Sequence, residues 1–64
     1  MMPFINVKML AGRSTEQKRA LVEALTQAIV DTCDAPREGT TVVLEECERE
    51  NWARGGVLVA DRQQ

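Results

Sequence analysis

Pro3 is the residue with the most distinctive chemistry, because it stands directly behind the opening methionines Met1 and Met2. Inside a chain, a proline nitrogen is an amide without a hydrogen. If processing leaves Pro3 as the first residue, its ring nitrogen is a secondary amine that can accept a proton. Reference α-amino groups titrate at roughly 7.7 to 8.0, and partial burial or nearby cations would lower such a pKa toward the range that suits a general base. Pro3 is therefore a candidate acid–base residue, and the alternative is a proline that only leads into a strand.

An alternating segment follows Pro3 and predicts a first strand over residues 4–10. One face of this strand is apolar and carries Ile5, Val7 and Met9, whereas the other face mixes apolar and polar side chains. A mixed face is expected where a strand meets a partner chain or a site. This arrangement would place Pro3 at the start of the strand.

A helix is predicted over about residues 15–33. Ser14 and Gln17 fit a capping box, with serine as the N-cap and glutamine at the third helical position. Pro36 marks the end of the helix, since the residue before a proline is pushed out of the α region. Apolar positions recur at helical spacing, and they are Leu21, Leu25, Ala28 and Ile29, with Ala24 and Cys33 beside them.

Residues 40–46 are rich in β-branched side chains and predict a second strand. A helix of roughly 28 Å and a strand of roughly 23 Å match a right-handed β-α-β unit with parallel strands. Further on, Trp52, the pair Gly55–Gly56 and the apolar stretch 57–60 predict a turn or small hairpin that covers a neighbour's sheet edge. We therefore expect an α+β fold with one domain over residues 1–64.

Size and composition limit the partners. A domain of about 60 residues buries only about 60% of its unfolded surface, so an oligomer is expected. The chain has no histidine, and Cys33 and Cys47 are isolated, which disfavours zinc and suggests reduced packing residues. A net charge of -2 gives no electrostatic footprint for nucleic acid, and no apolar run approaches the roughly 20 residues that span a bilayer. We expect a soluble cytoplasmic protein.

Taken in order, these features resemble the 4-oxalocrotonate tautomerases, also called 2-hydroxymuconate tautomerases. The similarity begins with Pro3 and its strand, continues through residues 12–18 and 34–36, and ends with Trp52 shortly before Gly55–Gly56. It covers nearly the whole chain. The resemblance implies a β-α-β subunit assembled as a homohexamer, a trimer of dimers, with active sites shared between subunits. It also implies that no metal or cofactor is used.

The same resemblance implies roles for three residues. Pro3 matches the amino-terminal proline that removes a proton from a 2-hydroxy-dienoate and returns it further along the conjugated chain. Arg13 matches an arginine that binds the substrate's carboxylate, and Trp52 takes the place of an aromatic residue in the site wall. Otherwise Arg13 is a solvated turn residue and Trp52 an interface or core anchor. The family's second substrate arginine falls on Thr41, so a monocarboxylate substrate is expected unless another arginine compensates, the candidates being Arg37, Arg49 and Arg54.

Alternative interpretations keep the fold and change the function. A hydratase or decarboxylase acting on a small unsaturated or keto acid would need an extra carboxylate, for which Glu45 or Glu46 is a poor candidate. A non-catalytic oligomeric binding module would result if Met1 and Met2 stay attached, because Pro3 would then be an amide. We expect translation to begin at Met2 in the natural protein, which leaves Pro3 free after removal of that methionine.

Overall fold

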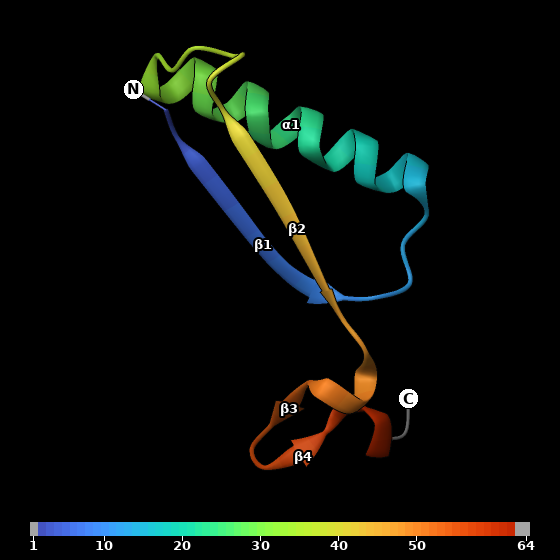
Figure 1. Cartoon of the computed structure of the whole chain (residues 1–64). Coiled ribbons are helices and arrows are strands. Elements are labelled where there is room, and N and C mark those ends of the chain that lie inside the picture. The colour runs from blue at the N-terminus through green and yellow to red at the C-terminus, as the bar shows by residue number, and fades with distance from the viewer. Residues whose placement is uncertain (1, 63–64) are drawn as a thin grey trace.

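The chain forms the predicted β-α-β unit, as a computed structural model that describes residues 2–62 shows (Figure 1). Strand β1 spans Phe4–Leu10, helix α1 spans Thr15–Cys33 and strand β2 spans Thr41–Cys47. The two strands are parallel neighbours, and α1 crosses over one face of the sheet that they form (Figure 1). The bounds predicted for the first strand and the helix are confirmed.

The register decides which side chains share a face of the sheet. It pairs Phe4 with Thr41 at one end and Leu10 with Cys47 at the other, and paired residues point to the same face. On the face toward α1, an ion pair of 2.7 Å joins Lys18 of the helix to a β2 carboxylate. The opposite face is open, and it carries Phe4, Asn6, Lys8 and Leu10 from β1 and Thr41, Val43, Glu45 and Cys47 from β2.

The two ends of α1 are set by local bonds. The capping box is present, because the Gln17 backbone N–H donates to Ser14 Oγ at 3.1 Å and the Ser14 N–H donates to Gln17 Oε1 at 2.9 Å. At the other end, Asp34 adopts the left-handed conformation with φ 57° and so closes the helix after Cys33. The helix has therefore already ended before Pro36, which only prevents its continuation.

The side of α1 that packs on the sheet overlaps only in part with the predicted apolar stripe. Leu21, Leu25 and Ile29 are half-buried as expected, and Val22 and Val30 join them. The remaining members of the stripe are exposed in the single chain: Ala24, Ala28 and Cys33. These three positions are therefore not covered by the two-stranded sheet of one chain.

Strand β2 begins and ends one residue later than residues 40–46. Thr40 stays in the loop because its hydroxyl donates to the Pro36 carbonyl at 2.8 Å and its N–H donates to the Arg37 carbonyl at 3.2 Å. Cys47, expected to follow the strand, is its last residue.

The predicted C-terminal hairpin is confirmed and lies beyond the end of the β1–β2 sheet (Figure 1). Its strands are β3, Ala53–Arg54, and β4, Val57–Leu58, and they pair antiparallel. Gly55 and Gly56 have φ of 61° and 80°, as a two-residue hairpin turn with two positive φ angles requires. Two short 3₁₀ helices, η1 (Arg49–Asn51) and η2 (Val59–Asp61), flank the hairpin and were not predicted.

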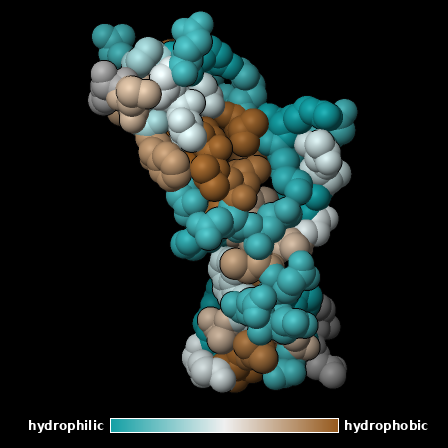
Figure 2. Space-filling model, viewed as in Figure 1, coloured by the Kyte–Doolittle hydropathy of each residue, from teal (hydrophilic) through white to brown (hydrophobic). Residues whose placement is uncertain are grey.

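The single chain encloses almost no core. Ala35 is the one buried hydrophobic residue among residues 2–62, while Phe4 is 64% exposed. Figure 2 shows a broad hydrophobic patch over the sheet and helix and a smaller one on the hairpin, where Val57 and Leu58 are exposed. Within the described part of the chain, none of the helices combines the length and apolar character needed to cross a membrane.

Candidate active site

Pro3 is anchored at the beginning of the sheet. It is half-buried, and its carbonyl oxygen accepts a hydrogen bond from the Thr41 N–H at 3.0 Å. This bond ties Pro3 to the first residue of β2 and leaves the ring nitrogen out of the sheet ladder. Met2 precedes it in the described chain and is 82% exposed, so the nitrogen is an amide here.

Arg13 lies at the opposite end of β1, in the turn that leads to α1. Gly12 takes a φ of 133°, a conformation that favours glycine, and this lets the chain turn directly after the strand. The Arg13 guanidinium is exposed and donates from Nη1 to the Leu10 carbonyl at 3.0 Å. Its charge has no carboxylate partner among residues 2–62.

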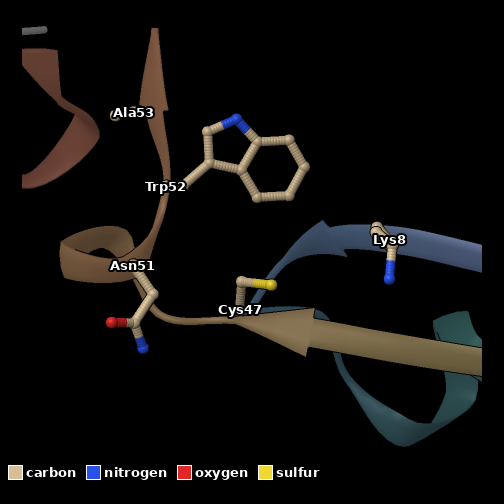
Figure 3. A pocket seen from close by; sticks show the side chains of 5 residues that line it. All are labelled: Lys8, Cys47, Asn51, Trp52 and Ala53. Carbon is tan, nitrogen blue, oxygen red and sulfur yellow. The ribbon is translucent and has the colours of Figure 1, made fainter. Parts of the chain in front are cut away.

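Trp52 borders a hollow at this same end of the sheet. The hollow has a volume of about 290 Å³ and is lined by Lys8, Cys47, Asn51, Trp52 and Ala53 (Figure 3). The indole of Trp52 extends to the side where Cys47 and Lys8 lie, while Ala53 points to the other side of β3 (Figure 3). Sequence reasoning singled out Trp52 but missed the other lining residues. Lys8 could not be found in this way, because only the tertiary fold brings β1 beside the segment that holds Asn51 and Trp52.

One chain does not bring the three candidate residues together. Pro3 precedes the first residue of β1, whereas Arg13 and Trp52 lie beyond the last residues of the sheet. A seven-residue strand is roughly 23 Å long, which is far beyond the reach of one small substrate. A site that contains all three residues must therefore combine parts of at least two chains.

The carboxylates considered for activating water are both engaged. Lys8 Nζ lies 2.7 Å from Glu45 Oε1 on the open face, and Lys18 Nζ lies 2.7 Å from Glu46 Oε1 on the helix face. The bond from Lys8 lowers the pKa of the Glu45 carboxyl, with Asn6 contributing less, and the same bond raises the pKa of Lys8. Neither glutamate offers the free carboxylate that a hydratase would need.

The pKa of Glu45 provides a prediction for this pair. Because the folded-state pKa is lowered, the pair's contribution to stability is present above the unfolded pKa and is lost as pH falls through the folded one. The contribution is small because both groups are solvated. Lys8→Met should raise the pKa of Glu45 in a carboxyl NMR titration, while the control Lys18→Met should leave it unchanged. An unaltered Glu45 pKa in Lys8→Met would contradict the assignment.

The three arginines considered as substitutes for an arginine at Thr41 differ in their engagement. Arg37 is paired with Glu23 and donates to Gln27 Oε1 at 2.9 Å. Arg49 donates from Nη2 to the Val59 carbonyl at 3.4 Å. The Arg54 guanidinium donates no hydrogen bond within residues 2–62.

Comparison with known proteins agrees with this architecture. The family model described as "Tautomerase enzyme" matches residues 3–62. The 2-hydroxymuconate tautomerase of Bacillus subtilis is 43% identical over 60 residues, which cover 94% of this chain and 97% of that protein.

Solved structures give the same result. The crystal structure of YwhB, a homologue of 4-oxalocrotonate tautomerase, has a TM-score of 0.93 at 41% identity and covers 95% of this chain and 100% of that one. A heterohexameric 4-oxalocrotonate tautomerase from Chloroflexus aurantiacus has a TM-score of 0.88 at 33% identity, covering 98% and 100%. The matching family and relatives are tautomerases, which are isomerases. The chain belongs to the tautomerase family, whose fold occurs in oligomers.

Proposed function

We propose that this protein is a cofactor-independent tautomerase that ketonises a 2-hydroxy-dienoate or a related enol acid. In the proposed step, the free amine of Pro3 takes the proton of the 2-hydroxyl group. The oxygen–hydrogen electron pair forms the new C=O bond, and the displaced π electrons take the proton back from Pro3 at a carbon further along the conjugated chain. The product is a 2-oxo acid, and Pro3 returns to its starting state.

The placement of Pro3 is the observation that carries this proposal. Its carbonyl is held by Thr41 at 3.0 Å, so the ring is positioned by the sheet while the nitrogen side stays outside the ladder. A nitrogen in this position serves as a base only when no residue precedes it. We therefore propose that the active form begins at Pro3, as the match of the family model from residue 3 supports.

Arg13 and Trp52 complete the proposed site. Arg13 binds the acidic end of the substrate and polarises the nearby carbonyl, a role that its exposed guanidinium without a carboxylate partner in residues 2–62 supports. Trp52 supplies an apolar wall, which its position over the 290 Å³ hollow supports. Both residues come from a different chain than the Pro3 that they serve.

The proposed assembly is a homohexamer built as a trimer of dimers. A second chain that runs antiparallel to the first would place its Arg13 end beside the Pro3 end of its partner. The near-absence of buried residues in one chain supports such an assembly, because the apolar patches need covering. The free thiols of Cys33 and Cys47 support a reducing, cytoplasmic setting, with residues 1–64 acting as one domain.

The assembly and the activity are tested together. Light scattering at micromolar concentration should give about six times the 7.1 kDa chain mass. Ultraviolet assays of 2-hydroxymuconate ketonisation should find the activity in that same fraction, provided that intact mass shows Pro3 as the first residue. A monomeric mass would remove the shared site, and an inactive hexamer beginning at Pro3 would remove the proposed reaction.

A further inference from the structure

The charged residues of the chain are distributed unevenly between the two ends of the sheet. Of the eight basic residues, four form ion pairs with carboxylates: Lys8, Lys18, Arg19 and Arg37. The other four have no carboxylate partner within residues 2–62: Arg13, Arg49, Arg54 and Arg62. All four belong to segments at the end where β1 and β2 finish and the hairpin begins (Figure 1). The same segments also carry the carboxylates of Glu48, Glu50 and Asp61, so an anion here would be bound by an individual guanidinium and not by the net charge of this end.

Arg54 is the member of this group that remains unassigned and unengaged. Arg13 already has a proposed role, and Arg49 donates to the Val59 carbonyl at 3.4 Å. Arg62 donates from Nη2 to the Arg54 carbonyl at 2.8 Å, which fixes the backbone of Arg54 and leaves its side chain free. The Arg54 guanidinium itself is exposed and donates no hydrogen bond to the described residues.

The backbone directs Arg54 to the same side of the hairpin as Trp52. Trp52 has an extended conformation, φ −129° and ψ 122°, and it continues directly into β3. Figure 3 shows Trp52 and Ala53 on opposite sides of this strand. Since side chains alternate along an extended segment, Arg54 follows on the Trp52 side, roughly 7 Å further along. A substrate lying against the indole is within reach of the Arg54 side chain.

We propose that Arg54 is a second carboxylate-binding residue, which makes a dicarboxylate enol acid the preferred substrate. This inference rests on the proposed tautomerase function. Arg13 would hold one carboxylate and Arg54 the other, each through the planar guanidinium that matches a carboxylate with two parallel hydrogen bonds. Thr41 contributes no charge, and Arg37 is already neutralised by Glu23. Arg54 thus takes the role of the arginine that is absent at position 41. In this proposal the preferred substrate is a dicarboxylate, in place of the monocarboxylate that Thr41 led us to expect.

The test compares two probes that differ only in the second carboxylate: 2-hydroxymuconate and 2-hydroxy-2,4-pentadienoate. Arg54→Met should lower kcat/KM for the dicarboxylate by at least about tenfold to a hundredfold, the effect that the loss of a single charge-assisted hydrogen bond would have. The value for the monocarboxylate should change little. Arg49→Met is the matched control, because it removes the same charge from the same end of the molecule, and it should not change the ratio between the two substrates.

Arg54→Lys provides a second variant that keeps the charge and loses the planar fork. It should show a smaller selective loss, and light scattering identifies which variants assemble as the wild type does. A selective loss on the dicarboxylate in either assembled variant supports the inference, and an equal change on both substrates overturns it. If the wild type beginning at Pro3 ketonises neither probe, the proposed function itself fails. If it ketonises both without any selective effect at Arg54, only the role of Arg54 fails.

Discussion

A chain that begins at Pro3 should ketonise enol acids, whereas a chain that retains Met1 and Met2 should be nearly inert. Acylation converts the Pro3 nitrogen into an amide whose lone pair is delocalised, so no base remains. A general base contributes about a hundredfold to ten-thousandfold in rate, and a loss of that size is expected. For the free form, the rate should rise with pH as the Pro3 amine loses its proton, because only the unprotonated amine can act as the base.

Both forms should fold alike, which makes the comparison a test of chemistry. Met2 is 82% exposed, and the Pro3 bond to the Thr41 N–H uses the carbonyl oxygen, which both forms keep. Two protein preparations, their intact masses, circular dichroism and one ultraviolet assay are sufficient. Comparable turnover by a verified form that starts at Met1 would show that Pro3 is not the base.

Arg13→Ala should reduce kcat/KM by about a hundredfold on both the dicarboxylate and the monocarboxylate, because the charged contact to the carboxylate common to both is lost. Stability should change little, since the single bond from Arg13 to the Leu10 carbonyl is exposed to solvent. The same pair of substrates therefore separates Arg13, which acts on both, from Arg54, which acts on one.

Arg19→Ala is the matched control for Arg13→Ala. Arg19 is an exposed arginine on α1 that pairs only with Glu16, so its loss removes the same charge without touching the proposed site. Thermal unfolding and light scattering should be alike for the two variants. Full activity of Arg13→Ala on both substrates would show that the assignment is wrong.

Local features determined the elements that could be predicted from the sequence. The alternation of residues 4–10, the capping box of Ser14 and Gln17 and the Gly55–Gly56 turn each depend on a few neighbouring residues. The resemblance to the tautomerases rests on the same local segments, and the family match confirms it. The predicted start of the second strand was one residue too early. Thr40 donates to the carbonyls of Pro36 and Arg37, and these bonds within the loop keep it out of the strand.

Only the tertiary structure decided how distant residues meet. The parallel register places Lys8 beside Glu45, and the two form an ion pair. From the sequence alone, it was not known whether Glu45 was free to act on a substrate. The length of β1 separates Pro3 from Arg13, so the proposed site needs more than one chain. The availability of Arg54 depends on which arginines find carboxylates or carbonyls, and such contacts link residues far apart in sequence. Sequence periodicity describes one segment at a time, whereas these properties arise from the pairing between segments.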